Sequence, residues 1–219
     1  MRKYLIFLCF LAGTASAEAP DSDGIFASTL LSDADFYRLA TCGALPESDC
    51  MTSALRWNKQ RLTLTVKPGG DAVSGAFLES LDRAARNAVA EVNGTGAGIA
   101  IDLVEEGPAD ITILPTALTE GTRLQEVEGF SGAGTMGVGY MTVWSDESNR
   151  ITEAVILIST SISEADLTSV MLEEVTQSLG FLFDVEGPVY QGSILSQTSN
   201  STTRLVGQDA ELLRLHYPP

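Results

Sequence analysis

The sequence contains one histidine, His216, and this scarcity limits the metal chemistry that the chain can support. Zinc peptidases bind their metal with two or three histidine side chains, and structural zinc sites use four histidines and cysteines. Cys9 lies within an apolar N-terminal stretch, so only Cys42 and Cys50 remain for the folded protein. The sequence therefore lacks the ligands of a conventional zinc site.

Basic residues are also scarce: 13 Lys and Arg stand against 29 Asp and Glu, which gives a net charge of −16. Such an excess of negative charge opposes binding to nucleic acid and to anionic membrane surfaces, so we expect no nucleic-acid partner. A solvated acidic surface on an exported protein explains this composition most simply. Cationic ligands and divalent ions would also suit it.

Long apolar runs are missing apart from residues 4–11, which are too few to span a bilayer. Arg2 and Lys3 precede this run, and a stretch of small residues that ends at Ala17 follows it. This arrangement is typical of a secretory signal peptide. We therefore predict a signal peptide over residues 1–17 with cleavage after about Ala17, a periplasmic or secreted location, and no membrane span.

Removal of the predicted signal peptide takes the basic count from 13 to 11 and the net charge from −16 to −18. It leaves 202 of the 219 residues, enough for one domain with a sizeable core. Cys42 and Cys50 are then the only cysteines, and they lie close together in sequence. In an exported protein this pattern predicts a disulfide between them, within an N-terminal segment over residues 18–55.

Alternating apolar residues predict strands, and a 3.6-residue period predicts helices, along most of the chain. The strands over 138–144 and 153–159 flank a polar turn and should form an antiparallel hairpin. Pro115 is expected to end the strand before it, and residues 116–137 form a long, Gly-rich loop. We predict an α+β domain, with helices packed on a mixed twisted sheet of about five strands. The strands are expected at 61–66, 98–104, 110–114, 138–144 and 153–159, the helices at 26–40, 74–92, 163–180 and 208–217, and an irregular stretch at 185–203.

The helix expected over residues 163–180 is the one around which the candidate site is organised. Ser163 and Asp166 are a capping-box pair that favours a helix start. Gly180 marks the end, because glycine adopts the positive φ that terminates helices. One face of this helix is an apolar spine of Leu167, Met171 and Val175.

The polar residues of this helix follow the spacing of a zinc-peptidase motif. In H-E-x-x-H-x-x-G, two histidines four residues apart bind zinc and the glutamate activates a water molecule. In the same register the sequence has Glu173, Glu174, Gln177 and Gly180. The glutamate and the glycine are present, and both histidines are replaced.

Further segments resemble, in the same order along the chain, the metzincin branch of the zinc peptidases, and matrixins most of all. Residues 109–113 resemble an A-D-I strand, residues 193–196 the S-I-M segment of the methionine turn with Leu195 in place of methionine, and residues 209–217 the closing helix. The resemblance implies a zincin-like fold over residues 56–219, with a cleft between an edge strand and the helix. The chain is also similar to the bacterial exported family called domain of unknown function 2927, which implies no known activity.

The sequence departs from the metzincin pattern at the metal. The three metal-binding positions fall on Glu173, Gln177 and Phe183, with Asp184 one residue further on. Phe183 has no donor atom, and Gln177 offers only a neutral amide oxygen. A Glu/Gln/Asp set suits zinc poorly, and calcium or magnesium usually requires more oxygen ligands than this motif supplies. We therefore expect no bound metal and no cofactor.

Three interpretations of Glu173, Glu174 and Gln177 remain open. In the first, they line a former active-site cleft that binds a peptide or protein without catalysis. In the second, the protein is a peptidase-like hydrolase in which Glu174 acts as a general acid or base, partnered by Glu173 or Asp184, with an atypical metal or none. In the third, they form a solvated helix face. We favour the first and keep the second as the alternative.

Two serines of the predicted irregular stretch have the side chains of nucleophiles. No histidine or lysine lies near Ser193 or Ser196 in sequence to activate them. A serine triad would need His216, and the spacing of these residues does not support one. We expect His216 at the surface or at a helix end, where a cation is mildly favourable.

Overall fold

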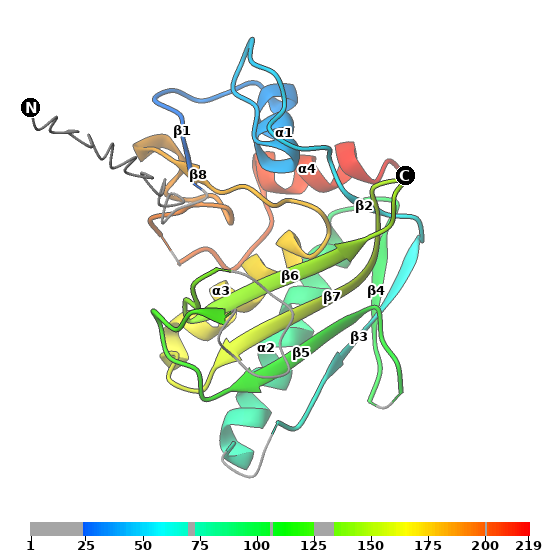
Figure 1. Ribbon diagram of the computed structural model, residues 1–219, viewed down its shortest axis with the longest axis vertical. Helices are drawn as coiled ribbons and strands as arrows, with labels where there is room; N and C mark the ends of the chain where they lie inside the picture. The colour runs from blue at the N-terminus through cyan, green and yellow to red at the C-terminus, as the bar shows by residue number, and fades with distance from the viewer. Residues whose placement is uncertain (1–23, 70–72, 106, 125–133, 200) are drawn as a thin grey trace, which may run out of the picture.

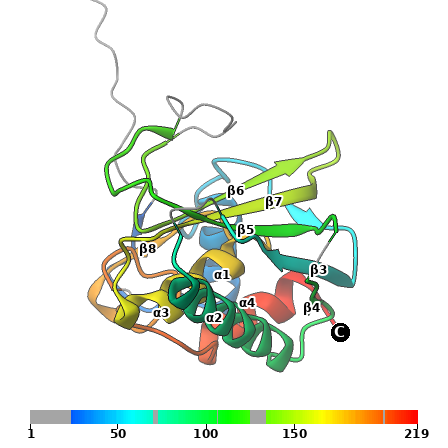
Figure 2. The same ribbon diagram turned by 90° about the horizontal axis from the view of Figure 1, so that it is seen from below.

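The computed structural model describes residues 24–69, 73–105, 107–124, 134–199 and 201–219. Within these ranges the chain forms one mixed sheet with helices packed against one of its faces (Figure 1, Figure 2). This arrangement agrees with the predicted mixed sheet and packed helices. The predicted signal peptide and residues 125–133 of the predicted Gly-rich loop lie outside the described residues.

The described part of the sheet has six strands, mostly parallel. Five of them lie in the order β6–β7–β5–β3–β4, and β2 pairs with the first residues of β7. The strand β6 runs antiparallel to β7 and lies at the edge, so the predicted hairpin is confirmed. The strands are β2 (Arg56–Trp57), β3 (Arg61–Val66), β4 (Ala100–Leu103), β5 (Ile111–Thr116), β6 (Gly139–Ser145) and β7 (Arg150–Ser159).

The strand β5 continues through Pro115 to Thr116, so the prediction that Pro115 ends it is wrong. Ile113 pairs with Val66, the last residue of β3, and the N–H of Lys67 donates to the carbonyl of Ile113 at 2.9 Å. Backbone groups of successive strand residues point alternately to the two neighbouring strands. The missing N–H of Pro115 therefore faces the side on which β3 has already ended, and no ladder hydrogen bond is lost.

Asp110, the acid of the A-D-I segment, joins β3 to β5. Its Oδ2 atom accepts hydrogen bonds from the backbone N–H of Thr63 at 3.0 Å and from the hydroxyl of Thr63 at 3.2 Å. Lys59 forms an ion pair with the other oxygen. Burial raises the pKa of the Asp110 carboxyl, but the hydrogen bonds from Lys59 and Thr63 and the charge of Lys59 outweigh it, and the net pKa is lowered. In this structure the motif acid stabilises the sheet.

Four α-helices are formed by the described residues, and none of them is long and apolar enough to cross a membrane. The hydroxyls of Ser74 and Ser163 accept hydrogen bonds from the backbone N–H groups of Phe77 and Asp166, as N-terminal caps do. The helices α2 and α3 lie side by side under the sheet, and α4 packs against α1 (Figure 2). The helices are α1 (Asp33–Cys42), α2 (Gly75–Gly94), α3 (Glu164–Gln177) and α4 (Gly207–His216).

The hydrophobic core lies between the sheet and the helices. The predicted spine of α3 is confirmed, because Leu167, Met171 and Val175 are all buried. Burying each such side chain contributes about 1.5–3 kcal/mol, and this burial holds α3 against the sheet. Alternate residues of three strands complete the cluster: Leu62 and Leu64 of β3, Ile111 and Ile113 of β5, and Ala154, Ile156 and Ile158 of β7.

The strand β1 (Ile25–Phe26) lies where the sequence predicts the start of a helix. It pairs in parallel with β8 (Val185–Glu186), and the N–H groups of Ile25 and Ala27 donate to carbonyls of that segment at 2.8 Å. The helix α1 begins only at Asp33. The prediction failed here because the partner strand is distant in sequence and lies in the stretch expected to be irregular. That stretch also contains a short 3₁₀ helix, η2 (Pro188–Tyr190).

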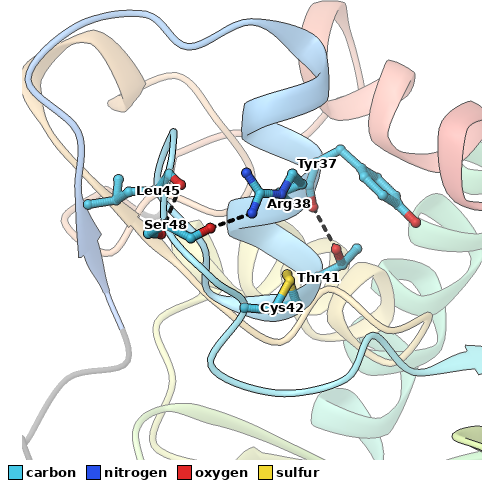
Figure 3. Close-up of a disulfide and its surroundings, with 7 residues drawn as sticks. Tyr37, Arg38, Thr41, Cys42, Leu45 and Ser48 are labelled. Carbon is cyan, nitrogen blue, oxygen red and sulfur yellow. Dashed lines mark hydrogen bonds between the residues drawn. A yellow bond between two sulfur atoms is a disulfide. The ribbon is translucent and has the colours of Figure 1, made fainter.

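The predicted disulfide between Cys42 and Cys50 is present, with Cα atoms 5.1 Å apart (Figure 3). It closes a loop that follows α1 directly. The guanidinium of Arg38 in α1 donates to the carbonyl of Ser48, and the Ser48 hydroxyl donates to the carbonyl of Leu45 at 2.9 Å. The disulfide and these bonds fix the loop against the end of the helix.

Candidate functional site

The edge strand β6 lies along α3, and the two elements meet at Glu174. This side chain is only 7% exposed. A Cβ atom added at Gly139, the first residue of β6, would overlap with the Glu174 carboxylate and lie 2.6 Å from Cγ1 of Val170. The absence of a side chain at Gly139 therefore lets the carboxylate reach the start of the edge strand. Gly139 is not among the residues predicted from the sequence, although a glycine in a strand often marks such a close approach.

The register of β6 determines which of its backbone groups point outward. Tyr140 lies opposite Leu157, and the N–H of Ser159 donates to the carbonyl of Val138 at 2.9 Å. Even-numbered residues therefore face β7, and the N–H and C=O groups of odd-numbered residues face the outer edge. Among the described residues, β6 pairs with β7 alone. The outward positions of the strand are Gly139, Met141 and Val143.

The polar residues of α3 extend from Glu174 toward the segment that follows the helix. Glu173 and Gln177 are half-buried on successive turns. The side-chain amide of Gln177 donates to Oδ1 of Asp184 at 2.8 Å, and Asp184 is only 6% exposed. The structure thus brings Gln177, at the second ligand position, into direct contact with Asp184. The row of polar residues formed by Glu173, Glu174 and Gln177 therefore ends at Asp184.

These residues do not fit zinc. Phe183, at the third ligand position, turns toward the disulfide loop, where its ring would lie 2.8 Å from a Cβ atom added at Gly43. The amide of Gln177 is engaged by Asp184 and offers no imidazole or thiolate donor. Within the described ranges, no group of three or more His, Cys, Asp or Glu side chains is arranged to hold a metal ion.

The family described as Protein of unknown function (DUF2927) matches residues 71–219, which is more than half of the chain. The chain belongs to this family. The matched residues contain β6, α3 and Asp184, and so the whole candidate site, whereas the disulfide loop precedes them. Among curated proteins no significant match is found.

Of the two placements expected for His216, the helix end is confirmed in this DUF2927 protein, but the side chain is buried, with 2% of its surface exposed. It is the last residue of α4, and its Nε2–H donates to the carbonyl of Leu55 at 2.9 Å. Its Nδ1 atom then accepts from the hydroxyl of Tyr37 at 3.1 Å. Burial lowers the pKa of His216 to about 4, and the charge of Arg56 acts in the same direction. The imidazole is a neutral structural link between distant segments.

Among the described residues Ser193 forms no hydrogen bond with the histidine, which bonds instead to Tyr37 and Leu55. The Ser193 hydroxyl donates to Oδ1 of Asp209 at 2.7 Å, and Oδ2 of Asp209 accepts from the N–H of Ile194 at 2.9 Å. Burial raises the pKa of Asp209, although these two hydrogen bonds oppose the shift. Asp209 therefore holds the turn at 193–196 against α4. This contact gives Ser193 a structural role.

Proposed function

We propose that this protein is exported and binds an extended peptide, or an extended segment of a partner protein, along the outer edge of β6. The observation that carries the proposal is the row of outward backbone groups at Gly139, Met141 and Val143, directly beside α3. A peptide that adds a strand to such an edge gains main-chain hydrogen bonds, and side-chain pockets then give specificity. The half-buried polar row of Glu173 and Gln177 would form the floor of this cleft.

We also propose that the fold is zincin-like and that the cleft descends from a peptidase cleft. Two features support this proposal: one antiparallel edge strand on a mostly parallel sheet, and beneath that strand a helix with the spacing E-E-x-x-Q. The donor set does not suit zinc. Binding without catalysis is therefore the function that we favour.

The experiment begins with selection of binding peptides from a random displayed library on the purified mature protein. The selected peptide is then titrated calorimetrically against the wild type, Val143→Pro and Val143→Ala. Proline removes the outward N–H of Val143 while leaving the bonds from β6 to β7 in place, because proline is tolerated where the N–H faces away from the sheet. Alanine shortens the same side chain and keeps the N–H, which makes it the matched control.

We expect Val143→Pro to weaken peptide binding by about ten-fold or more, because one main-chain hydrogen bond is lost and the edge is blocked. Val143→Ala should change the affinity much less. Equal affinities of the proline variant and the wild type would refute strand addition at β6. Circular dichroism and thermal unfolding verify that both variants are folded.

The alternative, hydrolysis assisted by Glu174, is favoured by one observation: the carboxylate of this residue reaches the start of the edge strand at Gly139. A peptide on that edge would bring a backbone carbonyl near it. Prolonged incubation of the selected peptide with wild-type protein and with Glu174→Gln, followed by mass spectrometry, separates the two functions. Cleavage of the peptide by the wild type but not by Glu174→Gln would support hydrolysis assisted by Glu174. A peptide that stays intact in both samples would support binding without catalysis.

Export has a test of its own. N-terminal sequencing of the protein purified from the periplasm or medium of the native organism should begin at Glu18, directly after the predicted cleavage site. A cytoplasmic protein that retains Arg2 and Lys3 would contradict this part of the proposal.

A further inference from the structure

An open hollow of about 660 Å³ lies where β2, β3 and β7 begin, away from the outer edge of β6. This volume is within the range of small-molecule sites in proteins. Three basic residues line it, together with the polar residues Asn58, Gln60 and Ser148. The basic residues are Arg56, Lys59 and Arg150.

The charge of this hollow is opposite to that of the molecule. After loss of the predicted signal peptide the chain has 11 basic residues and a net charge of −18, yet three of those basic residues line this one hollow. None of the described residues that line it is acidic. The neighbouring Asp110 pairs with Lys59, and Asp146 pairs with Arg150 at 3.3 Å. Arg56 forms no ion pair with any described residue, so one positive charge remains uncompensated.

The guanidinium of Arg56 lies over the aromatic ring of Tyr217. It lies 5.5 Å from the centre of the Tyr217 ring, a distance at which cation and ring attract each other. The Tyr217 hydroxyl donates to the carbonyl of Leu179 at 2.6 Å and accepts from the N–H of Trp57 at 3.0 Å. Two hydrogen bonds therefore hold the hydroxyl end of the ring beside which Arg56 lies, and the planar guanidinium of Arg56 has the paired donors that two-point recognition of an oxyanion requires.

We propose that this hollow binds a small molecule through its phosphate or carboxylate group, held by Arg56 with Lys59 and Arg150. Asn58, Gln60 and Ser148 supply further hydrogen-bonding groups for the rest of the ligand. An extended polyanion does not fit, because the negative charge of the whole molecule repels it. The hollow therefore selects a compact anion. This inference does not depend on peptide binding at β6.

The test uses the isotope-labelled mature protein and two probes, inorganic phosphate and citrate, each titrated at constant ionic strength with chloride as the exchanged anion. Amide chemical shifts of the segments over 56–60 and 148–150 report binding. Arg56→Gln removes the uncompensated charge. Arg86→Gln is the matched control, because it makes the same change of charge at an exposed α2 residue that pairs with Asp82 outside the hollow.

We expect saturable shifts for the wild type and for Arg86→Gln with at least one probe, and affinity at least about ten-fold weaker for Arg56→Gln. The probe that binds more tightly identifies phosphate or carboxylate as the preferred group. Arg56→Lys keeps the charge without the planar fork and should bind with intermediate affinity. Shifts that do not saturate, or equal weakening in Arg56→Gln and Arg86→Gln, would overturn the proposal, because either result describes a general counter-ion effect.

Discussion

Gly180 lies where the chain leaves α3 and passes close to the segment before β2. Its φ of +111° is one that residues with a side chain rarely adopt. A Cβ atom at this position would overlap with the carbonyl oxygen of Leu55 and lie 3.0 Å from Nε2 of His216. We therefore expect Gly180→Ala to lower the free energy of unfolding by about 2–4 kcal/mol, through backbone strain and overpacking together. Urea denaturation measures this change.

Gly94, the last residue of α2, is the control for this substitution. A Cβ atom there has no neighbour within 4 Å, and its φ is not positive. Gly94→Ala should leave stability unchanged or raise it by up to about 1 kcal/mol, because alanine favours helix. Similar losses in both alanine variants would show that Gly180 has no special conformational role.

His216 should make the stability of the protein depend on pH. Its pKa is lowered to about 4 in the folded protein, mainly by burial, whereas an unfolded histidine titrates near 6.5. Between these two values the unfolded chain binds the proton and the native protein does not. The contribution of neutral His216 to stability is therefore fully present above about pH 6.5. It is lost as the pH drops toward 4, and the free energy of unfolding falls by up to about 3 kcal/mol.

The measurement for His216 is the free energy of unfolding in urea at several values between about pH 7 and about pH 4.5. Carboxylates titrate in the lower part of this interval, so the comparison is with His216→Gln, which cannot gain the proton. The variant should be less stable than the wild type near neutral pH, and the difference should shrink as the pH falls. Parallel pH profiles would indicate that His216 does not titrate in this range.

At the scale of elements, the disulfide loop supports the segment that carries Phe183 and Asp184. The loop is short, since Cys42 and Cys50 are 8 residues apart, and the Phe183 ring packs over Gly43 within it. A cross-link over this separation restricts the unfolded chain and contributes about 2–3 kcal/mol. We expect the double substitution of Cys42 and Cys50 by serine to lower the free energy of unfolding by that amount.

Wild-type protein in reducing agent is the matched comparison for the serine variant. The two samples should unfold at the same urea concentration, because both lack the cross-link and retain the loop sequence. Unchanged stability in both would mean that the packing of Phe183 and the contact between Arg38 and Ser48 hold the loop without the cross-link (Figure 3).

At the scale of the whole molecule, net charge governs the response to salt. The net charge is −16 for the full sequence, or about −18 after loss of the predicted signal peptide. This charge favours solubility, and the like charges repel one another in the compact state. Ion pairs such as Arg61–Asp102, with 69% and 47% of the two side chains exposed, stabilise little. Raising sodium chloride from about 20 mM to about 500 mM should therefore raise the melting temperature by a few degrees, because screening weakens the repulsion. A melting temperature that falls would show that the surface ion pairs dominate.

The sequence by itself determined the features that depend on neighbouring residues. The cap at Ser163 follows from its capping-box sequence, and the apolar spine of α3 and the alternating strands follow from periods of 3.6 and 2 residues. The hairpin of β6 and β7 and the disulfide of Cys42 and Cys50 join segments close in sequence, and both are confirmed. The motif spacing also selected Gln177, and the structure joins it to Asp184, a contact that the sequence did not predict.

Only the tertiary structure decided the contacts between distant segments. The pairing of β1 with β8, the burial of His216 between Tyr37 and Leu55, and the basic hollow at Arg56 each join residues far apart in the chain. A local pattern shows that a residue is apolar, polar or charged, but not which distant group will lie beside it. Pro115 illustrates the same point, because it is tolerated in β5 only where β3 has ended. The packing of the whole sheet and its helices determines which distant groups lie beside each residue.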